Sequence, residues 1–194
     1  MRIIGGALRG RTLKTLRGAK TRPTADQLRQ TLFDVLGESI RGSLFLDAYA
    51  GSGSVGIEAL SRGAREAVLI ESSRAAIQVI RANVKNLELA GRARTVPLSV
   101  NRALERLARE GLRFDTVFVD PPYEKIEEYA RTLSALDRLE LLGPFAWVIV
   151  EHSKRLGLET RYGRLLQKKQ LRRGDSRLSF YTLDNNAGES ELFH

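Results

Sequence analysis

Two short segments of the sequence hold residue types that could carry out chemistry. The first is the run VFVDPPY, in which Asp120, Pro121, Pro122 and Tyr123 follow a stretch of apolar residues. Proline has no backbone donor and a fixed φ, so neither a central strand nor a helix continues easily through this pair. The four residues therefore predict a stiff corner at the end of a buried strand. Such a corner could hold the Asp120 carboxylate still for chemistry, or it could be only a tight turn.

The second segment is the glycine-rich run LDAYAGSGSVGIEALSRGA, which occupies residues 46–64. Gly51, Gly53 and Gly56 satisfy the pattern G-x-G-x-x-G, and Glu71 follows Gly51 by 20 residues. Glycines let a ligand approach the backbone, and an acid on the next strand can accept hydrogen bonds from a ribose. The pattern predicts a site for an adenosine-bearing cofactor. Asp47 favours the cationic S-adenosylmethionine, with a dinucleotide and a purely structural turn as the alternatives.

Strands that alternate with helices must position these two segments. Apolar runs at 44–48, 67–71, 93–98, 115–120 and 146–151 predict strands, and helices are expected near 54–62, 73–89, 101–110 and 124–138. This alternation is typical of an α/β fold with helices on both faces of a mostly parallel sheet. A closing antiparallel hairpin within residues 158–183 brings the expected sheet to seven strands.

The N-terminal region differs from the rest of the chain. Residues 2–16 predict a small β-hairpin with a break at Gly5 and Gly6, and a capping box at Thr24 predicts a helix that ends at Gly37. We therefore expect an N-terminal extension over residues 1–41, one catalytic domain over 42–184 and a frayed tail over 185–194.

The topology of such a sheet decides whether the two segments meet. Ligands of open α/β sheets bind beyond the carboxyl ends of the strands, at the point where the strand order reverses. If the order reverses between the first and fourth strands, Asp120 lies beside Gly51. Two unusual corners would then share one crevice, which favours a catalytic role for both.

Composition excludes several other classes of protein. The 194 residues include no cysteine and only two histidines, so we expect neither disulfides nor a Cys/His metal site. The longest apolar run, at 141–150, is about half of the ~20 residues that a membrane helix needs, and the first residues lack the apolar core of a signal peptide. We expect a cytoplasmic, monomeric protein without a metal or a membrane anchor.

The charge distribution points to a polyanionic partner. The formal net charge is +9, and residues 1–23 contain seven basic residues and no acid. A basic arm joined to a balanced domain is typical of nucleic-acid binding, although a solvated tail would show the same pattern.

Taken together, the two segments and the N-terminal runs RIIGGALRGRTL and RPTADQLRQTLFDVL resemble the RsmD family. Its members have the Rossmann-like class I methyltransferase fold and transfer the methyl group of S-adenosylmethionine to N2 of a guanine in 16S ribosomal RNA. The resemblance covers roughly residues 2–152. It implies 16S ribosomal RNA as the partner, within the assembled or assembling small ribosomal subunit.

The resemblance also implies roles for individual residues. The Asp120 carboxylate and the Pro121 carbonyl would accept the two N–H groups of the amine, Pro122 would stiffen the corner, and Tyr123 would stack on the base. The cofactor would contact Asp47, Gly51, Gly53 and Glu71, with Ser99 and the Val100 backbone N–H near its adenine. Four N-terminal residues would bind RNA: Arg9, Arg11, Arg22 and Thr24.

Two alternative functions fit part of the pattern. An amino-methyltransferase of the same fold could act on DNA adenine or on protein glutamine, because those nitrogens need the same two acceptors. A non-catalytic, RNA-binding ribosome assembly factor would explain the basic arm, although the intact DPPY corner and glycine loop argue against it.

Overall fold

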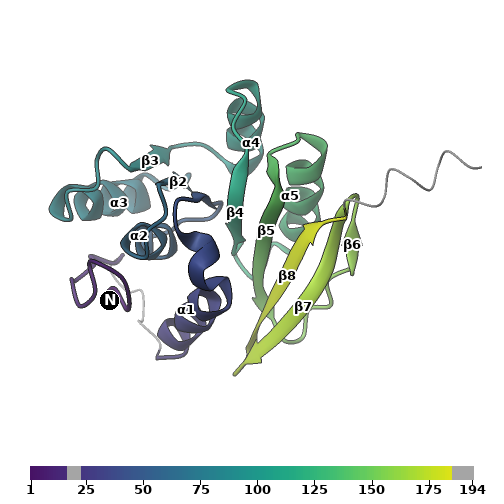
Figure 1. Cartoon of the computed structure of the whole chain (residues 1–194), viewed down its shortest axis with the longest axis horizontal. Helices are drawn as coiled ribbons and strands as arrows, with labels where there is room; N and C mark the ends of the chain where they lie inside the picture. Colours follow the sequence, from purple (N-terminus) through teal and green to yellow (C-terminus); the bar gives the residue numbers. More distant parts are fainter. Residues whose placement is uncertain (17–22, 185–194) are drawn as a thin grey trace, which may run out of the picture.

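The computed structural model describes residues 1–16 and 23–184, which form a central sheet with helices on both faces (Figure 1). The eight strands are β1 (Leu44–Asp47), β2 (Glu66–Ile70), β3 (Ala93–Val96), β4 (Phe114–Val119), β5 (Leu142–Ser153), β6 (Arg161–Tyr162), β7 (Leu165–Arg173) and β8 (Ser176–Leu183). The helices are α1 (Pro23–Leu36), η1 (a 3-10 helix, Gly37–Ile40), α2 (Ser54–Ser61), α3 (Arg74–Asn86), α4 (Val100–Arg109) and α5 (Ile126–Arg138).

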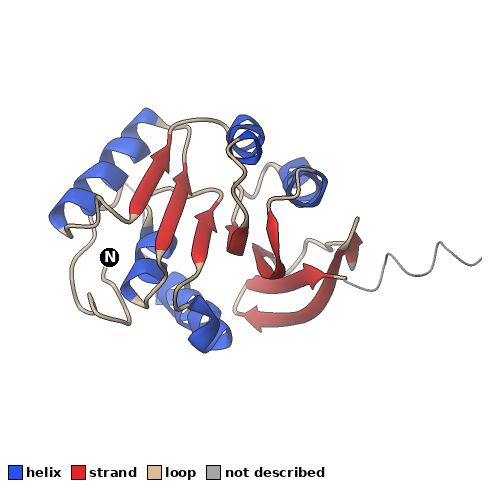
Figure 2. Ribbon diagram, turned by 45° about the horizontal axis from the view of Figure 1, so that its top comes forward, coloured by secondary structure: helices blue, strands red, loops and turns tan. Residues whose placement is uncertain are grey.

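The predicted alternation of strands and helices is confirmed. The first five strands pair in parallel, and Figure 2 shows them as a layer with helices on both sides. One face of the sheet buries Phe45, Leu69 and Phe118 against side chains of α1, α2 and α3. The other face buries Val117 and Val148 against side chains of α4 and α5. Because both faces are covered, the strands are apolar throughout rather than alternating.

The strand order β3-β2-β1-β4-β5-β8-β7-β6 reverses between β1 and β4. The chain builds outward from β1 to β2 and β3, then crosses to the other side of β1 to form β4. Asp47 at the end of β1 is in register with Phe118 of β4. The carboxyl ends of these two strands are therefore neighbours, as the sequence argument required.

The sheet has eight strands, so the prediction of seven is wrong. The segment ETRYGRLLQKKQL was expected to form one strand, but it folds into two, β6 and β7. Gly163 has a φ of 59° and sits in the tight turn that joins Tyr162 to Leu165. Because glycine adopts this left-handed conformation readily, the chain reverses there and adds the short strand β6 at the sheet edge.

The N-terminal hairpin is present in a reduced form. Its two arms meet in a single antiparallel bridge, between Arg2 and Thr12, with backbone hydrogen bonds on both sides. The segment lies beside α2 in Figure 1. Arg22, the Thr24 side chain and residues 185–194 lie outside the described part of the structure.

Helix α2 holds this N-terminal segment through one buried carboxylate. Glu58 accepts hydrogen bonds from the backbone N–H groups of Ile4 (2.8 Å) and Gly5 (2.7 Å), and its side chain is fully buried. The next residue, Gly6, has a φ of 77° and passes directly against the Ser61 carbonyl, where a Cβ atom would overlap it. The close approach and the positive φ both require glycine at this position.

No helix within residues 1–16 and 23–184 is long and apolar enough to cross a membrane.

Candidate active site

A pocket of about 400 Å³ lies at the carboxyl ends of β1, β2 and β4 and contains residues from both predicted segments. Most of the residues predicted for the catalytic and cofactor sites line it: Gly51, Glu71, Ser99, Val100, Asp120, Pro121, Pro122 and Tyr123. Asp47 and Gly53 do not line the pocket; they lie behind it. The reversal of strand order therefore brings the glycine loop and the DPPY corner to one cavity.

The three glycines of the loop have different physical roles. Gly51 and Gly53 have positive φ values of 53° and 79°, and Gly53 is the N-cap of α2. A Cβ atom on Gly51 would meet open space at the pocket wall, whereas one on Gly56 would overlap the Leu69 side chain. Gly51 thus leaves backbone accessible to a ligand, and Gly56 allows α2 to pack closely on β2.

Glu71 holds the loop in this shape. Its carboxylate accepts hydrogen bonds from the Gly51 N–H (2.9 Å) and the Ser73 N–H (2.7 Å). A carboxylate offers about four lone-pair positions. Glu71 can therefore keep both backbone contacts and still accept hydrogen bonds from the hydroxyl groups of a ribose in the pocket.

The DPPY corner is stiff, as its prolines predict. Strand β4 ends at Val119, and the Pro122 carbonyl accepts a hydrogen bond from the Lys125 N–H at 2.9 Å before α5 begins. This closed turn carries Tyr123 outwards, where 52% of its surface is exposed. The Asp120 side chain, in contrast, remains at the end of the strand, partly exposed to the pocket.

Three acidic side chains lie in a row near the carboxyl ends of adjacent strands: Asp47 ends β1, Asp120 follows β4, and Glu151 lies two residues before the end of β5. Val119 is in register with Val150, so the next residues, Asp120 and Glu151, are also neighbours on one face of the sheet. Asp47 occupies the same face at the end of β1, because it is in register with Phe118. Asp120 and Glu151 also line a second, smaller cavity of about 140 Å³ beneath α1.

This arrangement makes all three acids hard to ionise. Burial raises the pKa of Asp47 to about 7, although the Gly56 N–H opposes this shift. The pKa of Asp120 is raised well above its ordinary value. Burial is the main cause, and the negative charges of Glu151 and then Asp47 add to it. Burial likewise raises the pKa of Glu151. A cationic ligand beside the row would favour ionisation of these acids, whereas a phosphate group would oppose it, so the row favours the cation.

The three acids differ in their hydrogen bonds. Asp47 accepts the Gly56 N–H at 3.0 Å, and Glu151 lies 3.4 Å from the Tyr123 hydroxyl, which can donate to it. Within the described residues, the Asp120 carboxylate makes no hydrogen bond. Asp120 thus faces the pocket with its acceptor positions free for a ligand.

Sequence reasoning missed several residues around the pocket. Asn101 lines it next to Ser99 and Val100, at the start of α4, and adds a side-chain amide on the side predicted for the adenine. Tyr49 also lines it, and its hydroxyl lies 2.8 Å from the Thr132 hydroxyl of α5. Glu151 lies near the carboxyl end of β5, so the rule that sites form at strand ends could have identified it.

Two of the four predicted RNA-binding residues, Arg9 and Arg11, belong to the described part of the structure. Arg9 and Arg11 are exposed on the N-terminal hairpin, and neither lines the pocket. The Arg11 guanidinium donates a hydrogen bond to the Asn86 carbonyl at 3.3 Å, at the C-terminal end of α3. No group of three or more His, Cys, Asp or Glu side chains within residues 1–16 and 23–184 is arranged to hold a metal ion.

The reversed strand order, with a glycine loop at the reversal point, defines a Rossmann-like class I methyltransferase fold. A SAM-dependent methyltransferase from Agrobacterium tumefaciens shares the fold at 15% sequence identity and a TM-score of 0.63, covering 88% of this chain and 65% of that one. At this identity the likeness concerns the fold alone.

Closer relatives identify the family. The profile of the family described as "Conserved hypothetical protein 95" matches residues 1–182, and the chain belongs to this family, the RsmD family. Ribosomal RNA small subunit methyltransferase D of Escherichia coli strain K12 is 41% identical over 162 residues, covering 82% of this chain and 78% of the relative. A solved Escherichia coli structure, described as "Putative methyltransferase yhhF", has 37% identity and a TM-score of 0.82, covering 95% of this chain and 98% of that one.

Proposed function

We propose that this protein transfers a methyl group from S-adenosylmethionine to the exocyclic N2 of a guanine in 16S ribosomal RNA. Its family and its similarity to small subunit methyltransferase D support ribosomal RNA methylation. The position of Asp120 supports an amino group as the acceptor, because its unpaired carboxylate opens onto the same pocket as Gly51. Guanine N2 as the particular nitrogen follows from the resemblance to the family.

The donor set of the pocket fits S-adenosylmethionine better than a dinucleotide. The row of acids suits the positive charges of the sulfonium and the ammonium group, whereas it would repel a pyrophosphate. Glu71 is placed for the ribose hydroxyls, and Ser99, Val100 and Asn101 for the adenine. When bound, S-adenosylmethionine supplies an electrophilic methyl group.

The protein's own contribution is to orient the amine and to remove its proton. The lone pair of a guanine amino group is delocalised into the ring, so the amine is a weak nucleophile. Asp120 and the Pro121 carbonyl, held by the stiff corner, would accept its two N–H groups and direct the lone pair at the methyl group. Methylation leaves one proton too many on the nitrogen, and Asp120 is placed to accept it.

Tyr123 and the N-terminal hairpin would provide RNA contacts. The exposed Tyr123 ring suits stacking on an extruded base, a contact worth about 1–3 kcal/mol in comparable sites. Arg9 and Arg11 would bind phosphates, and Arg22 and Thr24 would contribute beside the site. We further propose that a monomer acts in the cytoplasm, on the assembled or assembling small ribosomal subunit.

Methyl transfer to small ribosomal subunits from a strain that lacks this methyltransferase tests the proposal. With radiolabelled cofactor, label should enter 16S ribosomal RNA, and mass spectrometry of the digested RNA should place it on guanine N2. Asp120→Ala should abolish turnover while cofactor affinity, measured by calorimetry, stays within a few-fold. Label in DNA or in protein alone would favour the alternative amino-methyltransferases, and an active Asp120→Ala enzyme would contradict the role of the carboxylate.

A further inference from the structure

A second hollow, separate from the cofactor pocket, lies on the other side of Tyr123. Its volume is about 400 Å³, within the roughly 300–1,000 Å³ of pockets that bind small ligands. It lies between the start of α5 and the turn that joins β7 to β8. Tyr123 lines both cavities, but Asp120 lines only the first. The two cavities therefore share Tyr123, and the reacting carboxylate lines only the cofactor pocket of the two.

The floor of the hollow is unusually apolar for a surface. Only three large hydrophobic residues are exposed in the described part of the chain, and two of them, Tyr123 (52%) and Ile126 (58%), line this hollow. Leu156 adds a further apolar side chain. Exposed apolar groups that gather in one depression are typical of a binding site rather than of a solvated surface.

One polar group in the hollow lacks a partner. Tyr129 is 1% exposed and lines the hollow, and its buried hydroxyl makes no hydrogen bond within the described residues. A buried hydroxyl without a partner costs folding free energy. A nucleobase, whose edge carries donors and acceptors, would supply this partner once its entry moves the side chains that cover the oxygen.

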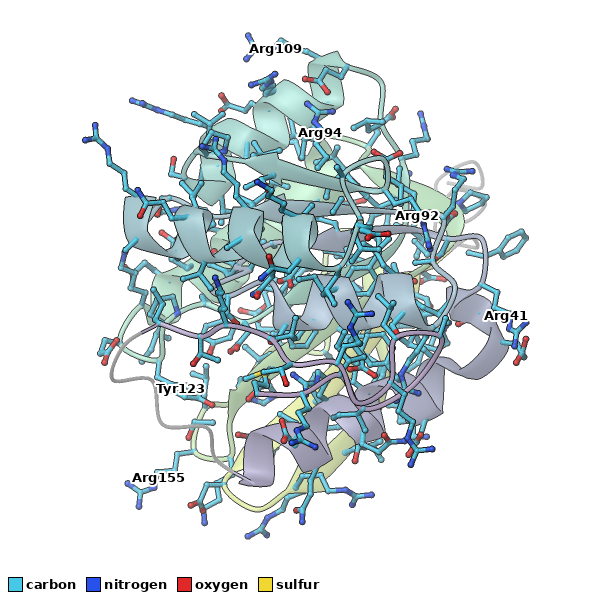
Figure 3. The ribbon with its side chains drawn as sticks, turned by 90° about the vertical axis from the view of Figure 1, so that its left-hand side faces the viewer. Arg41, Arg92, Arg94, Arg109, Tyr123 and Arg155 are labelled. Carbon is cyan, nitrogen blue, oxygen red and sulfur yellow. The ribbon has the colours of Figure 1, made fainter. Side chains whose placement is uncertain are left out.

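The rim of the hollow is positively charged. Arg155 and Asp175 are the charged residues that line it, and Lys154 and Arg172 lie close to Asp175. The hydrogen bond and charge of Lys154, with the charges of Arg155 and Arg172, hold the pKa of Asp175 below its ordinary value. Lys154 forms an ion pair with Asp175, which leaves two cations in excess. Arg155 is exposed and lies at the same end of the molecule as Tyr123 (Figure 3). This excess of positive charge matches the phosphates of an RNA strand.

From these features we infer that the hollow is a second nucleotide subsite, which holds a nucleotide adjacent to the methylated one. This inference rests on the proposed function. The base packs on Ile126 and the outer side of Tyr123, its polar edge reaches the Tyr129 hydroxyl, and its phosphate meets Arg155. Because Tyr123 lines both cavities, the methylated base and its neighbour lie against one aromatic ring.

The binding test replaces each of two exposed apolar residues by aspartate and compares how strongly the two variants bind. Ile126→Asp places an anion in the hollow and should weaken binding of unmethylated small subunits at least ten-fold, because it removes the apolar contact to the base and repels the nearby phosphate. Phe145→Asp is the control, because Phe145 is 86% exposed and does not line the hollow; its effect should stay within about two-fold. Equal binding by the two variants would overturn the inference, whether or not methylation is observed.

Two further measurements identify the occupant. Tyr129→Phe should weaken RNA binding without lowering the melting temperature of the protein, because the lost hydroxyl has no partner in the protein. A lowered melting temperature with unchanged RNA binding would assign the hydroxyl a structural role instead. A photoreactive phenylalanine analogue at position 126 should crosslink to RNA within one or two nucleotides of the methylated position. A crosslink to a ribosomal protein, or to distant RNA, would contradict a nucleotide subsite.

Discussion

Replacing Glu151 by glutamine should move the acid limb of the pH–rate profile to lower pH. Asp120 must be ionised to accept the proton that methylation releases, so activity is lost as the pH falls through its raised pKa. The negative charge of Glu151 is one cause of that raised pKa. Glutamine removes the charge but keeps an oxygen for the Tyr123 hydroxyl. The pKa of Asp120 therefore falls in the variant, and the active form persists at lower pH.

The size of the shift follows from the strand geometry. Asp120 directly follows β4 and neighbours Glu151 of β5, and adjacent strands lie about 4.8 Å apart. Two unit charges at about 5 Å in an effective dielectric of about 20 repel by roughly 3 kcal/mol. Because burial also keeps Glu151 partly protonated, the average repulsion is smaller. We expect the midpoint to fall by about one unit.

The assay is single-turnover methyl transfer to small ribosomal subunits with saturating cofactor between pH 5 and 9. Glu105→Gln serves as the control, because Glu105 is an exposed acid on α4 that lines neither the cofactor pocket nor the cavity beneath α1. Its profile should match that of the wild type. A Glu151→Gln enzyme that binds cofactor normally but keeps the wild-type midpoint would refute electrostatic coupling between the two carboxylates.

Three further predictions concern RNA binding and stability. Replacing Arg9 and Arg11 by alanine should flatten the slope of log affinity against log salt by about 1.5 in binding titrations, since each phosphate contact contributes about 0.7–0.9; an unchanged slope would exclude that role. Asp47→Asn should reduce the loss of stability between pH 4 and 7 in urea unfolding, because a carboxyl whose pKa rises from 3.8 to about 7 on folding costs up to about 4 kcal/mol once ionised; an unchanged pH dependence would contradict the raised pKa. Gly6→Ala should destabilise the fold by about 1–3 kcal/mol more than Gly10→Ala in thermal unfolding, since both positions have positive φ but only at Gly6 would a Cβ atom meet the backbone of α2; equal losses would show that the close contact is relieved.

The parallel part of the fold could be predicted because its signals are local. Apolar strands, intervening helices and the two prolines after Asp120 can each be recognised from a short run of consecutive residues. The missed strand β6 shows the limit of such signals. A two-residue strand carries almost no pattern, and Gly163 alone did not distinguish a turn from a glycine within a longer strand.

The parts of the candidate site that depend on the end of a single strand could be predicted from the sequence. The reversal of strand order placed Asp120 beside Gly51, as the rule for open sheets requires. The proximity of Glu151 to Asp120 depends instead on the register between β4 and β5, which the sequence does not specify. The hollow beyond Tyr123 needs residues from α5 and from the turn between β7 and β8, about 50 residues apart in the sequence.

The outer edge of β7 has a consequence for association between copies of the chain. Strand β6 pairs with β7 at Leu165 and Leu166, so along most of this nine-residue strand β8 is the single neighbouring strand within residues 1–16 and 23–184. An open edge of this length is a template for sheet extension by a second chain. Here it carries four cations, Lys168, Lys169, Arg172 and Arg173. Two such edges would repel each other on approach, so the arrangement protects the protein against aggregation through its sheet.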